Sequence, residues 1–300
     1  MMADMMDDRT GDRMDDTTRG WVNGFLGMLI FSGSLPATRV AVAALDPLFL
    51  TVARAAIAGL LAAALLLAFR PQRPRRGDLA SLGIVALGVV VGFPLLTALA
   101  LRHVTSAHST LFIGLLPLAT AVFGALRGGE RPRLAFWLFS AAGSVLVGGF
   151  ALTGTQDASV AGDALMVAAI VVCGLGYAEG GRLSRRLGSW QVICWALVLA
   201  LPAMAVLTLV TLPASWAAVG RPAWLGLAYV SLFSMLIGFV FWYRGLSQGG
   251  IAAVGQLQLL QPFFALALAG ALLEETVSGS MVAVMAAVVL CVAGAKRFAA

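Results

Sequence analysis

The hydrophobic residues of this chain form long runs that are separated by short polar connections. Each run is close to the twenty or so residues that cross a hydrocarbon core of roughly 30 Å as a helix. A helix is expected in lipid because it satisfies its own backbone hydrogen bonds. The pattern therefore predicts an all-α integral membrane protein. Its ten transmembrane helices are expected at Trp21–Val42, Leu48–Phe69, Leu79–Leu99, Val104–Leu126, Leu134–Leu152, Ala164–Gly181, Val192–Leu212, Trp224–Tyr243, Ile251–Leu273 and Gly279–Ala295.

The composition agrees with lipid as the main solvent of the chain. Hydrophobic residues make up 60% of the 300 residues and charged residues only 11%, whereas a soluble domain carries about 25% charged residues. The short connections leave no room for a soluble domain, and the sequence has no nucleotide-binding loop or Rossmann fingerprint. We therefore expect no cofactor and no catalytic centre.

The three cysteines, Cys173, Cys194 and Cys291, lie inside apolar runs. Buried cysteine usually behaves as a small hydrophobic residue. The sequence also has no CxxC or Cys/His spacing of the kind that binds a metal. We therefore predict no metal centre.

The positive charge is distributed unevenly over the connections. If the N-terminus is cytoplasmic, sixteen of the 20 lysines and arginines lie on the cytoplasmic side, and Arg39, Arg54, Arg102 and Arg221 lie on the other. Basic connections remain on the cytoplasmic side during insertion. We therefore predict a multi-pass protein of the cell inner (plasma) membrane with both termini cytoplasmic. The net charge of +6 is then a topology signal, and no nucleic-acid partner is expected.

The chain divides into a tail and two similar segments. Residues 1–20 hold six aspartates and three arginines, which predicts a disordered cytoplasmic tail. The five-helix segments are 21–152 and 162–296, and at a constant offset of 145 residues Pro117 pairs with Pro262 and Glu130 with Glu275. Five crossings reverse the direction of the second copy. The halves are therefore expected to be inverted repeats with a substrate site between them.

Several of these residues resemble a known family. Gly33-Ser34 followed by Arg39, Arg54 in the second run, and the repeated run of Ala or Gly, Leu, Ala, Pro and Glu resemble the drug/metabolite transporter superfamily, in its ten-helix, two-repeat (EamA-type) branch. The resemblance implies a secondary transporter that works by alternating access. Its central cavity would be lined by helices one, three, four, six, eight and nine. The chain looks most like the bacterial exporters of aromatic amino acids.

The expected partners are therefore a small-molecule substrate, namely an amino acid or related metabolite, and membrane lipid; a monomeric state is compatible with the pattern. A broad drug or nucleotide-sugar carrier is an alternative, but a phosphate-bearing substrate would favour several cavity arginines, and only Arg39 and Arg54 are placed for that role. An intramembrane enzyme is a second alternative. Its one hint is His108 beside Ser109, and neighbours in a helix point about 100° apart.

Polar side chains inside the predicted helices are the candidates for substrate binding. Ser34 and Thr38 are four residues apart on one face of the first helix. Gln258 and Gln261 share a face of the ninth helix and offer amides to the amino and carboxyl groups of a zwitterion; alternatively, they hold helices together. His108 in the fourth helix is a candidate proton carrier, or a neutral histidine bonded to a neighbouring helix.

Aromatic rings and prolines complete the candidates. Phe93 and Tyr177 are the expected platform for an aromatic solute, with stacking worth about 0.5–1.5 kcal/mol. Pro117 and Pro262 each remove a helical hydrogen bond, so we predict a symmetric pair of kinks that line the cavity and act as hinges. Glu179 is expected to pair with the arginine three residues further on, as ordinary helix electrostatics.

Overall fold

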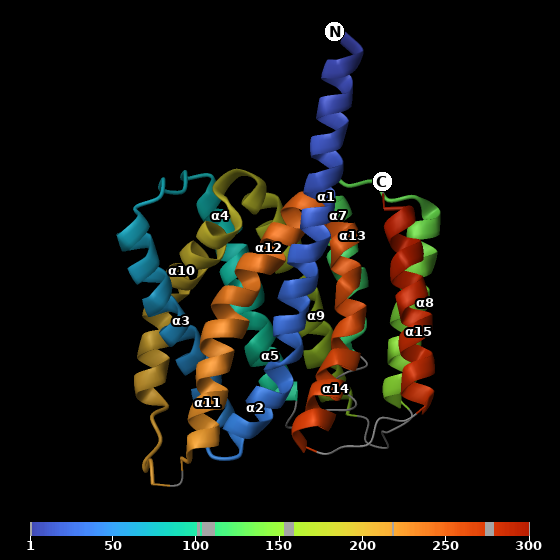
Figure 1. The fold of residues 1–300 in the computed structure, drawn as a ribbon. Coiled ribbons are helices and arrows are strands. Elements are labelled where there is room, and N and C mark those ends of the chain that lie inside the picture. Colours follow the sequence, from blue (N-terminus) through green and yellow to red (C-terminus); the bar gives the residue numbers. More distant parts are fainter. Residues whose placement is uncertain are drawn as a thin grey trace.

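The structure is a computed structural model that describes residues 2–100, 103, 112–152, 159–217, 219–273 and 279–299. Every regular element in this part of the chain is a helix, and the helices stand side by side as one bundle (Figure 1). The described residues are therefore all-α, as the hydrophobic pattern predicts.

One membrane helix of the first half begins at a residue suited to that position. Asp46 precedes the second membrane helix, and its carboxylate accepts hydrogen bonds from the backbone N–H groups of Leu48 and Phe49 at 2.8 and 3.1 Å. These are N–H groups that a helix start leaves without partners. The elements are α1 (Met2–Ser32), α2 (Ser34–Val42), α3 (Pro47–Phe69), α4 (Asp78–Val85), the π-helical segment η1 (Ala86–Gly92), α5 (Phe93–Ala100), α7 (Leu116–Gly128) and α8 (Leu134–Leu152).

The second half follows the same scheme. Ser159 caps its first helix by accepting from the N–H of Gly162 at 3.4 Å, and Arg185 and Arg186 occupy the last turn, where positive charge is favourable. The elements are α9 (Val160–Leu187), α10 (Ser189–Val210), α11 (Arg221–Tyr229), the π-helical segment η2 (Val230–Ile237), α12 (Gly238–Gly249), α13 (Ile251–Gly255), the 3₁₀ segment η3 (Gln256–Leu260), α14 (Gln261–Leu273) and α15 (Gly279–Arg297).

Six helices of the described residues are long and apolar enough to cross a membrane, and each overlaps a predicted span. They are Asp16–Val42, Pro47–Phe69, Asp78–Ala100, Val160–Leu187, Ser189–Val210 and Arg221–Gly249. Shorter apolar helices at Leu116–Gly128, Leu134–Gly149 and Ile251–Ala265 overlap three further predicted spans. The chain is membrane-embedded, and the count of ten crossings stays a prediction.

The helices of the two halves pack on each other reciprocally. α1, which opens the first half, packs along α12 of the second, and α9, which opens the second half, packs along η1 and α5 of the first. α3 packs on α10, and α7 packs on α13. α8 packs on α15, and these two helices stand next to each other in Figure 1. A two-fold relation between the halves produces this pattern. A contact between helices that are not counterparts then occurs twice, as for α1 with α12 and α9 with α5, and a contact between counterparts lies at the axis.

Glycines allow the reciprocal helix pairs to approach closely. A Cβ atom added at Gly88 would lie 2.5 Å from the carbonyl oxygen of Val172, and one added at Gly245 would lie 2.5 Å from the backbone nitrogen of Gly24. These distances exclude any larger residue at either position. Helix association in lipid depends on such close packing, since no hydrophobic force draws the helices together there.

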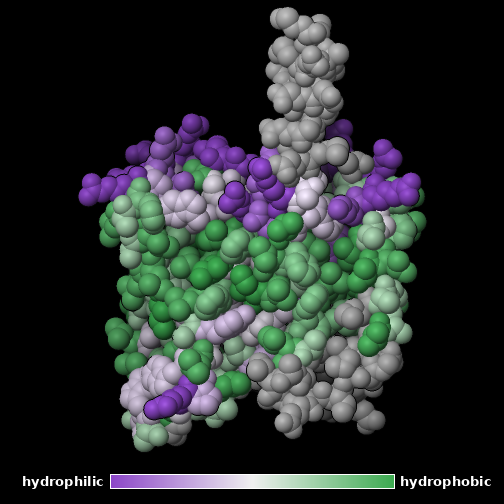
Figure 2. All heavy atoms as spheres, viewed as in Figure 1, coloured by the Kyte–Doolittle hydropathy of each residue, from purple (hydrophilic) through white to green (hydrophobic). Residues whose placement is uncertain are grey.

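Hydrophilic residues gather at one end of the bundle, above an apolar belt (Figure 2). We call this end the arginine-rich end. α1 continues beyond it in Figure 1, through residues that are expected to form a disordered tail; that expectation stays a prediction. The exposed basic residues of the connections and termini at this end are Arg19, Arg70, Arg73, Arg75, Arg76, Arg127, Arg131, Arg133, Arg182, Arg185, Arg186, Arg244, Lys296 and Arg297.

Candidate functional site

A polar contact between two helical segments of the second half, α9 and η3, lies inside the bundle. Gln258 in η3 is 0% exposed, and its Nε2 donates to the hydroxyl of Tyr177 in α9 at 3.5 Å, a long hydrogen bond. The sequence predicts both residues as substrate-binding candidates on separate helices, and the structure places them in contact. Tyr177 is itself buried, so the contact has no direct access to solvent.

Aromatic rings surround this contact. The ring of Tyr177 lies 5.4 Å from that of Trp242 and 6.0 Å from that of Phe239, measured between centroids. Phe31 from α1 meets Phe239 at 5.0 Å, and Tyr243 meets Phe239 at 5.3 Å. These five buried rings come from α1, α9 and α12. We call them, together with Gln258, the aromatic centre.

Two polar atoms of the aromatic centre have no hydrogen-bond partner among the described residues. They are Oε1 of Gln258 and Nε1 of Trp242, one acceptor and one donor. An unpaired polar group in an apolar interior costs about 1–3 kcal/mol, so the two atoms call for an explanation, such as a functional role or a bound water.

Hydroxyl groups form hydrogen bonds between the break at α1 and α2 and the segments α11 and η2. Ser34 follows the break between α1 and α2, and its hydroxyl bonds the Ser234 hydroxyl of η2 at 2.8 Å. The hydroxyl of Tyr229 donates to the carbonyl of Ile30 at 2.9 Å. A Cβ at Gly33 would lie only 2.3 Å from that hydroxyl. Gly33 is therefore required for the close approach of Tyr229 to the break.

The remaining predicted residues are less closely associated with the aromatic centre. Thr38, Phe93 and Gln261 are half-buried, and no ring contact joins Phe93 to the five rings. His108 lies outside the described residues. The sequence analysis did not predict Phe31, Phe239 or Trp242 as site residues. Two sequence features point to this cluster: Phe31 directly precedes Ser32-Gly33, and Trp242 is followed by a second aromatic residue, Tyr243.

The paired prolines follow equivalent breaks in the backbone. Pro117 is the second residue of α7, after a turn at 114–115, and Pro262 is the second residue of α14, after the 3₁₀ segment η3. The two helices begin at Leu116 and Gln261, 145 residues apart. Proline is tolerated in a first helical turn because its missing N–H would have no helical partner there. The irregular turn thus lies just before each proline.

Two carboxylates join the halves at the arginine-rich end. Glu179 of α9 is 0% exposed, and its Oε2 pairs with Nε of Arg127 in α7 at 3.1 Å. Its Oε1 pairs with Arg182, the predicted partner. Arg182 also donates to the hydroxyl of Ser81 in α4 at 3.1 Å. Glu179 therefore binds across the halves as well as within its own helix.

Glu130, just after α7, makes the second connection. Its two oxygens accept from the backbone N–H groups of Ile251 and Ala252, each at 2.7 Å, and Oε1 also pairs with Nη2 of Arg185 at 2.9 Å. We call Glu130, Glu179, Arg127, Arg182 and Arg185 the ion-pair cluster. It connects α7 to α9 and α13 at the arginine-rich end.

The described residues contain no group of three or more His, Cys, Asp or Glu side chains that could hold a metal ion. The three cysteines are unpaired. Arg54 in α3 buries its Nε without a partner among the described residues. None of these features provides catalytic chemistry.

An all-helical membrane protein whose halves pack reciprocally around a buried polar centre has the architecture of a secondary transporter. The model of the EamA-like transporter family matches this chain twice, at residues 18–153 and 160–295. The chain therefore belongs to the EamA-like transporter family.

Two comparisons extend this result. A protein of Bacillus subtilis (strain 168) named "Uncharacterized transporter YdeK" is 71% identical over 286 residues, which cover 95% of this chain and 100% of that protein. A solved crystal structure with 24% identity has a TM-score of 0.76 and covers 92% of this chain and 97% of its own. At this identity the crystal structure shows the fold alone.

Proposed function

We propose that this transporter exports small organic solutes, aromatic amino acids or related metabolites, by alternating access around the aromatic centre. The observation that carries the proposal is the buried contact between Gln258 and Tyr177, with an unpaired amide oxygen beside five rings. Because the sequence has no nucleotide-binding loop, the energy would come from an ion or solute gradient.

The chemistry of the aromatic centre suits a zwitterion with a ring. The Oε1 atom of Gln258 can accept from an ammonium group, and the Nε1 of Trp242 can donate to a carboxylate. Hydrogen bonds to charged groups contribute about 1.5–3 kcal/mol each. The rings around Tyr177 offer edge-to-face contacts worth about 0.5–1.5 kcal/mol. An aliphatic solute would form the polar contacts and lose the ring contacts.

The ion-pair cluster supplies the closed end that alternating access requires. Loading from the arginine-rich end, which the charge distribution predicts to be cytoplasmic, requires the contacts of Glu130 and Glu179 to open. Arg127 and Arg182 are 44% and 43% exposed, so both can find water when they separate from Glu179. Opening therefore leaves no arginine buried and unpaired, and the carboxylate of Glu179, which is 0% exposed in the cluster, must gain water as the end opens.

Transport by purified protein in proteoliposomes tests the proposal. Labelled phenylalanine and tryptophan should be moved faster than labelled leucine and alanine. Gln258→Ala and His108→Ala, at matched reconstitution, should reduce affinity for the aromatic solutes. If no amino acid is transported or competes, while a lipophilic drug or a nucleotide sugar is transported, the proposed substrate class is wrong.

A further inference from the structure

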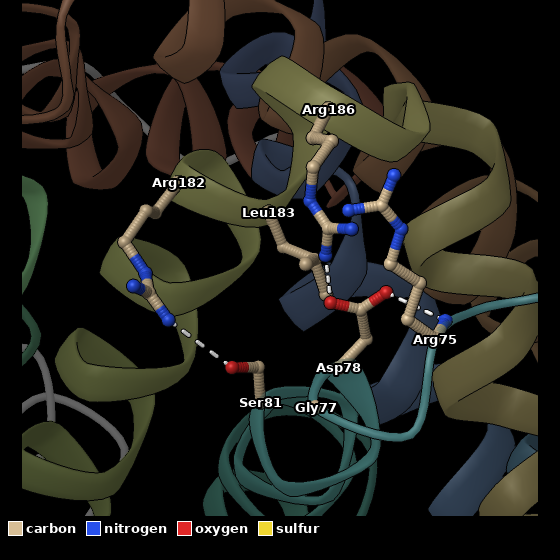
Figure 3. A pocket seen from close by; sticks show the side chains of 7 residues that line it. All are labelled: Arg75, Gly77, Asp78, Ser81, Arg182, Leu183 and Arg186. Carbon is tan, nitrogen blue, oxygen red and sulfur yellow. Dashed lines mark hydrogen bonds and ion pairs between the residues drawn. The ribbon is translucent and has the colours of Figure 1, made fainter.

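A basic pocket opens between α4 and α9 at the arginine-rich end (Figure 3). Its volume is about 540 Å³, within the range of about 300–1,000 Å³ that is usual for ligand sites. It lies between the connection that leads into α4 and the last two turns of α9. Its polar lining consists of Arg75, Asp78, Ser81, Arg182 and Arg186.

The pocket has more positive than negative charge. Asp78 is the one acidic residue of the lining, and its carboxylate pairs with Arg186 and accepts from the backbone N–H of Arg75 at 2.8 Å. The guanidinium of Arg75 has no bonded acceptor among the described residues. In Figure 3 the guanidinium groups of Arg75 and Arg186 reach toward the same space beside Asp78. An anion placed there would contact two guanidinium groups.

The position of the pocket along the bundle indicates which anion it meets. α4 opens the apolar span Asp78–Ala100, and α9 closes the apolar span Val160–Leu187. The pocket therefore lies where two apolar spans end, at the depth of lipid headgroups. Guanidinium groups match the geometry of phosphate oxygens and bind them with two parallel hydrogen bonds. Basic pockets between membrane helices are suited to anionic headgroups.

We propose that this pocket binds the phosphate group of an anionic lipid headgroup. Arg75 and Arg186 hold the phosphate oxygens, and the hydroxyl of Ser81 and the guanidinium of Arg182 complete the lining. The bound headgroup bridges α4 of the first half and α9 of the second, beside the contact between Ser81 and Arg182 at 3.1 Å. An anionic lipid would thus stabilise the closed arginine-rich end.

Binding to the purified full chain in detergent tests this inference independently of any transport substrate. Native mass spectrometry would measure the retention of phosphatidylglycerol, with phosphatidylcholine and inorganic phosphate as the other ligands. Arg75→Gln should weaken phosphatidylglycerol binding about fivefold, the effect of one basic side chain near an anionic lipid. Its guanidinium bonds no described acceptor, so thermal unfolding should show a normally folded variant.

Arg73→Gln is the matched control, because Arg73 is exposed in the same connection and lies outside the pocket lining. It should bind phosphatidylglycerol like the unmodified protein. Equal weakening in Arg73→Gln and Arg75→Gln would mean diffuse surface attraction and would overturn the site. Equal retention of phosphatidylcholine, or displacement of the lipid by inorganic phosphate at similar concentration, would overturn the lipid assignment.

Discussion

The carboxylate of Glu130 accepts a hydrogen bond from the backbone N–H of Ile251 at 2.7 Å and so joins the end of α7 to the start of α13. These helices belong to the fourth and ninth apolar runs, which are counterparts in the repeat. The C-terminal end of α7 lies beside the N-terminal end of α13, so the two helices run in opposite directions there. A carboxylate is favourable at a helix start, where N–H groups lack partners and the helix dipole is positive. Glu130 therefore stabilises the closed end of the bundle.

Replacing Glu130 with alanine should open the arginine-rich end. The change leaves two N–H groups without their acceptor, and hydrogen bonds to a charged group are worth about 1.5–3 kcal/mol each. The buried Cys173, one turn before Tyr177, is a suitable reporter in a variant that carries Cys194→Ala and Cys291→Ala. Its alkylation from the arginine-rich side should accelerate at least about tenfold, the factor for about 1.4 kcal/mol. Glu130→Gln retains an acceptor and should have a smaller effect, and equal rates in all three proteins would contradict the role.

Removing the carboxylate of Glu179 and removing its two arginine partners should lower the thermal stability of the protein to different extents. Glu179→Gln removes the charge and leaves two arginines that can reach water. The double variant Arg127→Gln/Arg182→Gln instead leaves a buried carboxylate without a partner, for which a loss of about 3–5 kcal/mol is typical. Thermal unfolding of the purified proteins should show the larger loss for the double variant. A larger loss for Glu179→Gln would mean that the carboxylate is hydrated.

Gln258→Ala should weaken solute binding at least about tenfold, because the lost hydrogen bond to a charged ammonium group contributes about 1.5–3 kcal/mol. Tyr177→Phe should have a smaller effect, since it keeps the ring. Gln256→Ala is the matched control: like Gln258, Gln256 is 0% exposed in η3 and has an unpaired Oε1, but its Nε2 donates to the carbonyl of Ala252 at 3.4 Å and not to Tyr177. Equilibrium binding of labelled phenylalanine measures the three variants. The same loss in Gln256→Ala and Gln258→Ala would indicate a general effect on η3.

Pro117→Ala and Pro262→Ala should slow transport more than they lower the yield of folded protein. Each proline occupies a first helical turn, so its loss removes no native hydrogen bond, while the restored N–H lets the preceding irregular turn become α-helical. Pro202→Ala is the control, because Pro202 lies inside α10 and has no counterpart in the first half. Transport per folded molecule, compared with yield, separates the effects. Unchanged transport in both hinge variants would make the breaks static packing features.

Cysteine labelling in intact cells tests the predicted orientation. Gln72 lies in the exposed connection between α3 and α4 at the arginine-rich end, and Ser215 is exposed in the connection between α10 and α11 at the opposite end. In a variant without native cysteines, Gln72→Cys should react with an impermeant reagent only after the cells are opened. Ser215→Cys should react in intact cells. The reverse pattern would invert the topology.

The sequence by itself determined the helical class, the apolar runs and the uneven charge. These features are local, because a run of apolar residues in lipid must satisfy its own backbone hydrogen bonds. The equivalent breaks before Pro117 and Pro262 are local too, since each follows from a proline ring. The two halves have a proline at equivalent positions of the repeat, and α7 and α14 accordingly begin 145 residues apart.

Only the tertiary structure decided which side chains meet at the centre. Phe31 and Trp242 come from helices more than two hundred residues apart in the chain, and both pack into the aromatic centre, whereas Phe93 does not. Glu179 likewise gained Arg127 as a partner across the halves. A helix that is apolar on all sides has no single hydrophobic face to turn inward. The facing side chains are therefore set by close packing against neighbouring helices, which hydrophobic periodicity does not encode.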